Sequence, residues 1–190
     1  MSPLALLASL LLSATPPTGY PLPCMYPDRF EQGAMEHAAH CAREEGEALV
    51  LAPAVRERLD FGTEALAPVA AGRGWHWVRP DGASAAVLTY DNGADDFIEG
   101  RTRGRGPDGL MRYYDSRLDL VLQTPYRWAE PYDHGRAIVC DDCRTERVDG
   151  GEHSIQVGTR WSAIDRDGRR LLPWQTSRLA VQAALDAQRR

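Results

Sequence analysis

The sequence lacks three features that would place it in a common functional class. It has no surplus of positive charge, because 22 arginines and no lysine stand against 27 acidic residues, for a net charge of −5. Nucleic-acid binding needs a basic face, so this balance argues against it. No apolar run reaches the roughly 20 residues that a membrane-spanning helix needs. None of Ser84, Ser154 and Ser162 stands in a nucleophile-elbow motif, so a serine hydrolase has no support.

The composition that is present indicates one globular domain. Hydrophobic residues make up 43% and charged residues 26% of 190 residues, which is typical of a folded chain with its own core. The 17 glycines and 13 prolines predict many turns.

The first residues, MSPLALLASLLLSATPP, predict a secretory signal peptide over 1–14. The apolar run Leu4–Leu12 has the length of a signal-peptide core and is too short to span a bilayer. A disordered apolar N-terminus is the alternative. A lipoprotein is disfavoured, because Pro23 stands where a small residue normally precedes the cysteine. We therefore expect an exported protein, periplasmic or secreted, with no membrane span after cleavage.

Four cysteines in an exported chain predict disulfides, whereas the same number in the cytosol would indicate metal or redox chemistry. Three pairings are formally possible. The simplest is local, with Cys24 joined to Cys41 and Cys140 joined to Cys143.

Two helices are predicted at the ends of the mature chain. Residues 27–45 have a capping-box pattern beginning at Asp28, and Phe30, Ala34 and Cys41 repeat at helical spacing. Residues 15–60 are therefore expected to be a disulfide-tied helical segment. The tail 174–190 is expected to form a C-terminal helix, capped by Thr176 or Ser177.

The region between these helices predicts short antiparallel strands joined by glycine-rich turns. It is also internally repetitive. WHWVRPDG at 75–82 aligns with MRYYDSRL at 111–118 and with WSAIDRDG at 161–168. YDNGADDFIEGR, which begins at Tyr90, similarly aligns with YRWAEPYDHGR, which begins at Tyr126. The predicted fold is mainly β: hairpin units at 61–173, near 75–110, 111–160 and 161–173.

This pattern resembles the WG-repeat, or KWG-repeat, family over about residues 58–173. The shared signature is Trp-x-x-Val/Ile-x-x-Asp-Gly followed by Tyr-Asp…Phe…Glu-Gly. The chain departs from it in having no Trp-Gly dipeptide, since the units read Trp-His, Met-Arg and Trp-Ser. The resemblance implies a β-rich repeat of exported or surface bacterial proteins, and it implies no catalytic residue.

The pair Cys140–Cys143 has three interpretations. A disulfide would brace the long spacer before the third unit, which is the favoured one. A zinc site would combine Cys140 and Cys143 with His153 and a further ligand such as Asp141, Asp142 or Glu152. A redox dithiol is disfavoured, because acids between the cysteines oppose thiolate formation. Small Cys-x-x-Cys rings are nevertheless reducible, so this third interpretation stays open.

Two other clusters of possible metal ligands have an ordinary structural explanation. His37 and His40 share one face of the predicted N-terminal helix and could hold a metal, but helix histidines are more often solvated or partly buried. Acids at 91, 95, 96 and 99 crowd one turn without the regular alternation of a calcium loop, so a solvated turn is preferred.

Aromatic residues offer the main candidate binding surface, because exposed rings can stack on sugars or on a peptide. The candidates are Trp75, Trp77, Tyr90, Tyr126 and Trp128. The favoured function is a non-enzymatic binding or interaction module of the bacterial envelope, with a protein, a peptide or cell-wall glycan as its ligand and no required cofactor. The alternative is a thiol-redox or zinc-binding protein that uses Cys140, Cys143 and His153.

Overall fold

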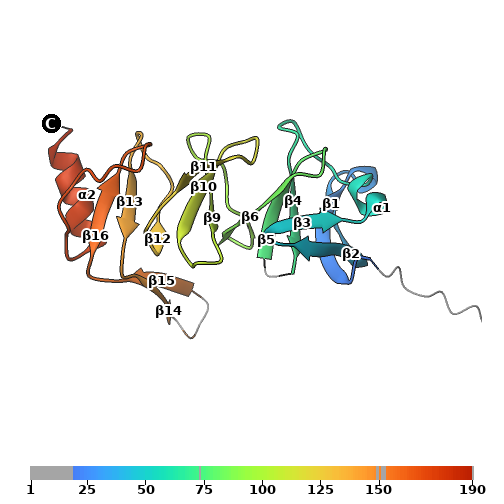
Figure 1. The fold of residues 1–190 in the computed structure, drawn as a ribbon, viewed down its shortest axis with the longest axis horizontal. Coiled ribbons are helices and arrows are strands. Elements are labelled where there is room, and N and C mark those ends of the chain that lie inside the picture. Colours follow the sequence, from blue (N-terminus) through green and yellow to red (C-terminus); the bar gives the residue numbers. More distant parts are fainter. Residues whose placement is uncertain (1–18, 73, 149, 151–152, 190) are drawn as a thin grey trace, which may run out of the picture.

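The computed structural model describes residues 19–72, 74–148, 150 and 153–189, and the predicted signal peptide lies outside them. The chain is mainly β, as predicted, and its sheets stand in a row along the long axis of the molecule (Figure 1). A six-stranded unit forms one end of the row and the C-terminal helix the other. Among the described residues, no helix combines the length and apolar character that crossing a membrane requires.

The first unit is a nearly closed antiparallel barrel with the strand order β3-β2-β1-β4-β5-β6. Its strands are β1 (Leu22–Asp28), β2 (Ala34–Glu45), β3 (Ala48–Leu51), β4 (Ala67–Ala71), β5 (Gly74–Val78) and β6 (Ser84–Val87). The two end strands approach each other, and the Ser84 hydroxyl bridges them. It accepts a hydrogen bond from the Leu49 N–H at 2.8 Å and donates to the Leu49 carbonyl at 3.1 Å. The barrel interior holds one core that includes Tyr26, Leu49, Leu59, Val69 and Val78.

The predicted helix over 27–45 is wrong. Asp28 does cap a turn, since its carboxylate accepts from the Phe30 N–H at 2.8 Å, but the resulting 3-10 helix η1 ends at Glu31. Gln32 and Gly33 then take positive φ values of 55° and 80°, which breaks the helix and turns the chain into β2. Pairing of β2 with both β1 and β3 overrides the helical spacing. In this region only the four-residue α1 (Pro53–Arg56) is α-helical.

This correction removes the proposed histidine pair. Both histidines are exposed on β2, whose pairing with β1 is irregular between Ala38 and Ala42. Among the described residues, neither belongs to a group of close potential metal ligands. The helical face that would have brought them together does not exist.

Two three-stranded sheets continue the row, and a small hairpin precedes them. The hairpin comprises β7 (Thr89–Tyr90) and β8 (Gly93–Ala94). The middle sheet comprises β9 (Thr102–Arg105), β10 (Met111–Tyr114) and β11 (Leu120–Gln123). The last sheet comprises β12 (Trp128–Ala129), β13 (Ala137–Cys140) and β16 (Trp161–Ile164).

A second core joins the middle and last sheets and includes Met111, Tyr113, Tyr132, Val139 and Ile164. The C-terminal helix α2 (Arg178–Ala187) lies on β13 and β16, as Figure 1 shows. Its predicted cap is confirmed at Ser177, whose hydroxyl accepts from the Ala180 N–H at 3.2 Å. Val181 and Leu185 on one helix face enter a third core with Trp161.

Three hairpin turns share one hydrogen-bond pattern. In each turn, the N–H of the first residue donates to the carbonyl of the residue four positions later. The N–H of the residue three positions later donates to the carbonyl of the first residue. The first turn residues are Arg79, Asp115 and Asp165, which follow β5, β10 and β16. The donating residue has a positive φ in all three turns: Gly82 at 94°, Leu118 at 63° and Gly168 at 80°. A fourth turn, at Gly106–Leu110, has the same pattern.

Candidate functional site

Both local cysteine pairings predicted from the sequence are confirmed as disulfides. Cys24 and Cys41 join β1 to β2 inside the barrel, with 5.7 Å between their Cα atoms. Cys140 and Cys143 are joined with 5.6 Å between their Cα atoms. Both disulfides belong to hydrophobic cores, and the second also stands where the chain leaves the body of the protein.

The segment that leaves the body is a hairpin of β14 (Arg144–Val148) and β15 (His153–Val157), here called the arm. It is inserted between β13 and β16, which pair with each other in the last sheet. The arm projects to one side of the row (Figure 1). Within the described residues, β14 and β15 pair only with each other, and the residues of both strands are exposed or half-buried.

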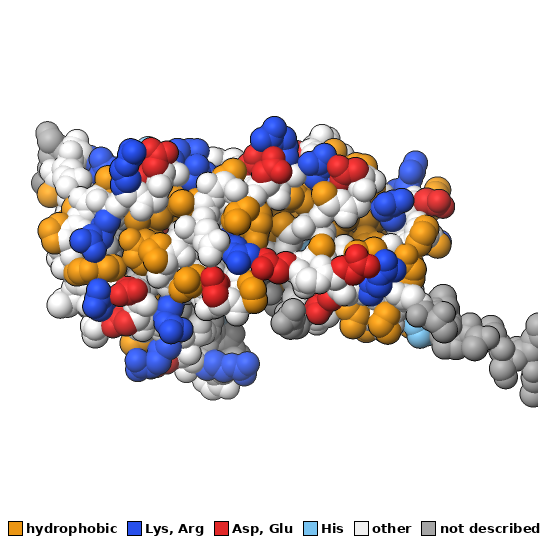
Figure 2. All heavy atoms as spheres, viewed as in Figure 1, with side chains coloured by type: hydrophobic (Ala, Val, Ile, Leu, Met, Phe, Trp, Pro, Cys, Tyr) orange, Lys and Arg blue, Asp and Glu red, His pale blue; other side chains and the backbone are white. Residues whose placement is uncertain are grey.

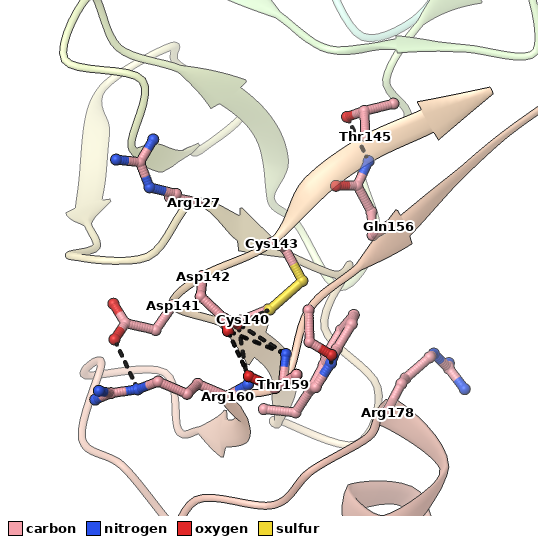
Figure 3. Close-up of a disulfide and its surroundings, with 12 residues drawn as sticks. Arg127, Cys140, Asp141, Asp142, Cys143, Thr145, Gln156, Thr159, Arg160 and Arg178 are labelled. Carbon is pink, nitrogen blue, oxygen red and sulfur yellow. Dashed lines mark hydrogen bonds and ion pairs between the residues drawn. A yellow bond between two sulfur atoms is a disulfide. The ribbon is translucent and has the colours of Figure 1, made fainter.

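The foot of the arm, residues 140–143 and 158–160, is fixed by the disulfide and by the Asp142 carboxylate. Cys140 is the buried last residue of β13, and its partner Cys143 directly precedes β14. Between them, the Asp142 carboxylate accepts from the Thr159 hydroxyl at 2.7 Å and from the Thr159 and Arg160 N–H groups at 3.0 and 2.9 Å. Figure 3 shows these bonds crossing from one side of the foot to the other. The arm therefore leaves the body in a fixed direction.

Gly158 allows the two sides of the foot to come this close. A Cβ atom there would lie 2.7 Å and 2.8 Å from the two cysteine sulfurs and 2.7 Å from an Asp142 oxygen. Any larger residue would push the disulfide away from β15. The Gly158 carbonyl also accepts from the Trp161 indole N–H at 2.9 Å. Gly158 and Thr159 carry no signal in the sequence, where only the Cys-x-x-Cys spacing marks this region.

The carboxylate of Asp142 is held in its charged form. Burial acts to raise the pKa of Asp142, but hydrogen bonds from Thr159 and Arg160 together outweigh it and lower the pKa below the usual value for aspartate. A lowered pKa means that the clamp stabilises the foot above the pKa of the unfolded chain, about 3.9. This stabilisation is lost as pH falls through the lower pKa of the folded state.

We expect the foot to loosen below about pH 4. Amide exchange measured by NMR, corrected for the intrinsic exchange rate, should show protection of Thr159 and Arg160 falling there. Asp142→Ala should lose this protection at every pH. The matched control Asp167→Asn, which removes an exposed carboxylate, should behave like the unaltered chain. Equal protection in the Asp142 variant would show that the carboxylate does not hold the foot.

The zinc ligands predicted from the sequence are only partly brought together. Among the described residues, one group of His, Cys, Asp or Glu places its ligand atoms within 4.8 Å of one another, and it consists of Cys140, Asp142 and Cys143. His153 lies outside this group, exposed at the start of β15. The two sulfurs are bonded to each other, so they offer no thiolate ligands in this state.

The five candidate aromatics do not form one exposed row. Tyr126 is buried in the second core, which corrects its assignment to a binding surface. Trp77 is half-buried and donates its indole N–H to the Asp95 carbonyl at 2.9 Å. Trp128 is also half-buried, with the Arg103 guanidinium 5.4 Å from its ring centre.

The other two aromatics differ in their exposure. Trp75 is half-buried on β5, whereas Tyr90 is largely exposed at 62%. On the face drawn in Figure 2, charged and hydrophobic side chains are interspersed along the row. Neither observation indicates a stacking platform for sugar rings.

The acidic turn predicted at 91–99 contains a buried ion pair. Asp95 and Arg103 have side chains only 5% and 4% exposed, and one carboxylate oxygen lies 2.5 Å from the guanidinium. This corrects the expectation of a solvated turn for Asp95. The pair is enclosed by protein and has a structural role.

A cavity of about 300 Å³ lies between α2 and the loop after β12. Two of its arginines are in ion pairs, Arg178 with Glu130 at 2.6 Å and Arg189 with Asp133 at 3.1 Å, and Arg136 donates to the Gln188 side-chain carbonyl at 3.4 Å. The cavity could hold a small group, but each of its arginines already contacts another side chain.

Comparison with known proteins adds no identification. No protein-family model matches the chain, and neither the curated proteins nor the solved structures include a significant match.

Proposed function

We propose that this chain is an exported, non-enzymatic interaction module that contacts its partner through the arm. The observation that carries this proposal is the mounting of the arm. It is a projecting hairpin whose strands pair, within the described part of the chain, only with each other, and it stands on a foot fixed by a disulfide and by Asp142. A two-stranded hairpin is only marginally stable alone in water. A rigid foot lowers the entropy lost when the arm is ordered by a partner.

The arm favours a polypeptide partner over a glycan. Exposed strand edges present N–H and C=O groups that bind an added strand through main-chain hydrogen bonds. Binding of sugar rings would instead call for gathered exposed aromatics, and Tyr126 is buried. Of the three ligand classes expected from the sequence, a protein or a peptide therefore fits best.

We also infer that the body is built from degenerate WG-type hairpin repeats. The three turns after β5, β10 and β16 support this, since they share their hydrogen bonds and their positive φ at the same position. The aligned segments that begin at Tyr90 and Tyr126 also share a tight turn. It is closed by a bridge between Ile98 and Arg101 in the first and between Asp133 and Arg136 in the second. Such units stack on their neighbours to bury their faces.

Export is supported by the cysteines. All four are paired and all four are buried, which suits an oxidising compartment. The leader-like sequence at 1–14 agrees with this assignment.

The test is site-specific photocrosslinking in cells that export the chain under its own leader. A photoreactive phenylalanine analogue at Ile155, which is 48% exposed on the arm, should give a discrete adduct. The matched control is Leu179 on α2, which is 75% exposed and should give none. An arm that yields no adduct, or no more than Leu179 yields, would contradict the proposal.

A second candidate function is zinc binding or thiol exchange at the foot. It is favoured by a group of close ligand atoms, those of Cys140, Asp142 and Cys143. This chemistry requires the disulfide to open, with two electrons and two protons supplied by a dithiol that is itself oxidised to a disulfide. Zinc would then be held by two thiolates, the Asp142 carboxylate and water.

A further inference from the structure

The two faces of the arm differ in character. Residues opposite each other in an antiparallel pair point to the same side. One face therefore carries Val148, Ile155 and Val157, together with His153 and the Arg144–Glu146 ion pair at 2.6 Å. The other face carries only polar side chains: Thr145, Arg147, Ser154 and Gln156. The arm is thus an amphipathic hairpin whose apolar face is too small to bury itself.

The two edges of the arm also differ. β14 carries three charged residues, Arg144, Glu146 and Arg147, and charges along an edge discourage pairing with another strand. β15 reads His-Ser-Ile-Gln-Val and carries no acidic residue and no arginine. Its central residue, Ile155, is among the exposed large hydrophobic residues of the chain. The β15 edge is therefore the one suited to accept a strand.

We propose that the occupant of this edge is β15 of a second copy of the chain, paired antiparallel about a two-fold axis at Ile155. This inference rests on the proposed function of the arm and names its partner. The pairing places Ile155 opposite Ile155, Ser154 opposite Gln156 and His153 opposite Val157. It creates a four-stranded sheet in which Ile155 and Val157 of both arms gather on one face.

Self-complementarity favours a second copy over an unrelated strand. Pairing about Ile155 opposes no like charges, because each His153 faces a valine. The corresponding pairing of two β14 strands about Glu146 would oppose two carboxylates. The foot holds the arm clear of the body, so two copies can meet without the bodies approaching first (Figure 1). A contact of five residues per chain is small, and the dimer is accordingly weak.

The test is sedimentation equilibrium of the full mature chain at concentrations up to about 100 μM. We expect the mass to rise toward twice that of one chain. Ile155→Lys places two ammonium groups opposite each other and should weaken dimerisation about tenfold or more. Ile155→Val should retain it. The matched control Leu179→Lys alters a more exposed apolar residue on α2 and should leave dimerisation unchanged.

Two outcomes would overturn the second-copy proposal. One is a mass that stays monomeric over the whole range, and the other is a dimer that survives Ile155→Lys. Equal melting temperatures of the variants establish that each is folded. If the chain is monomeric but still crosslinks through Ile155 to a molecule of another mass, the second-copy proposal is wrong and the proposed function of the arm is retained. If neither a dimer nor an adduct forms, the proposed function of the arm is contradicted as well.

Discussion

Replacing Arg103 with methionine should lower the free energy of unfolding by about 3–5 kcal/mol, because it leaves the Asp95 carboxylate buried without its counter-charge. The Arg103 guanidinium contacts both carboxylate oxygens, at 2.5 and 3.1 Å, and also donates to the Ala129 carbonyl at 3.2 Å. Urea denaturation followed by circular dichroism would measure the change.

The effect is large because this pair joins successive parts of the row. Trp77 of the barrel donates to the Asp95 carbonyl, Arg103 belongs to the middle sheet, and Ala129 belongs to the last sheet. The Arg103 carbonyl also accepts from the Leu88 N–H at 2.9 Å, just beyond β6. Loss of the guanidinium therefore weakens the junctions between all three units.

The control is Arg117→Met, which removes a 73% exposed arginine paired with Asp115 and Asp119. Exposed pairs contribute about 0–1 kcal/mol, so this variant should remain close to the unaltered chain. The double variant Asp95→Asn, Arg103→Met removes the uncompensated charge and should recover part of the loss. An Arg103→Met effect as small as that of Arg117→Met would show that the buried pair does not hold the units together.

Local turn chemistry made the β region predictable. Pro-Asp-Gly at 80–82 and Arg-Asp-Gly at 166–168 specify a positive φ at the glycine, and both turns occur where the sequence predicts them. The middle turn follows the same hydrogen bonds although Leu118 stands in the glycine position. The alignment with the other units located this turn, which local propensity alone would not indicate.

The N-terminal segment was mispredicted because local and tertiary signals disagree there. Residues 27–45 have helical spacing and a cap at Asp28, yet β2 gains hydrogen bonds along both edges by lying between β1 and β3. Gly33 favours the strand over the helix, since its φ of 80° turns the chain back along β1. The Cys24–Cys41 disulfide, predicted from spacing, is compatible with either structure and could not separate them.

The candidate site was only half visible in the sequence. Cys140, Asp142 and Cys143 stand out as possible ligands, and HSIQV at 153–157 has the polar–apolar alternation of a strand. The partner strand RTERV gives no β signal, because its charged residues interrupt the alternation of a half-buried strand. That the hairpin projects, and that Gly158 approaches both sulfurs, depends on contacts between segments far apart in the chain. Such contacts leave no periodic signal.

Removing the Cys24–Cys41 disulfide with two alanines should destabilise the chain by about 3 kcal/mol, because its cysteines lie 17 positions apart and close a long loop. The same replacement of Cys140 and Cys143, 3 positions apart, should cost only about 2 kcal/mol from the smaller loop. Urea denaturation of both double variants, and of the unaltered chain with and without reductant, measures the difference.

The location of the damage should also differ. Loss of Cys24–Cys41 weakens the barrel core and should reduce amide protection throughout β1 and β2. Loss of Cys140–Cys143 should reduce protection mainly in the foot and the arm, because the rest of the last sheet keeps its pairing. If removal of either disulfide reduces amide protection in the barrel to the same extent, the expected difference in location is contradicted.

The same Cys140 and Cys143 variant separates the brace from the second candidate function. A brace predicts that neither thiol is alkylated before reduction, and that the variant loses stability alone. A metal centre predicts zinc on the purified protein in equal molar amount, lost in the variant while the fold persists. A redox centre predicts disulfide exchange with a dithiol substrate that the variant cannot perform. Because both cysteines are buried and Gly158 lies against their sulfurs, we expect the brace: slow reduction, no bound zinc, and loosening confined to the foot and the arm.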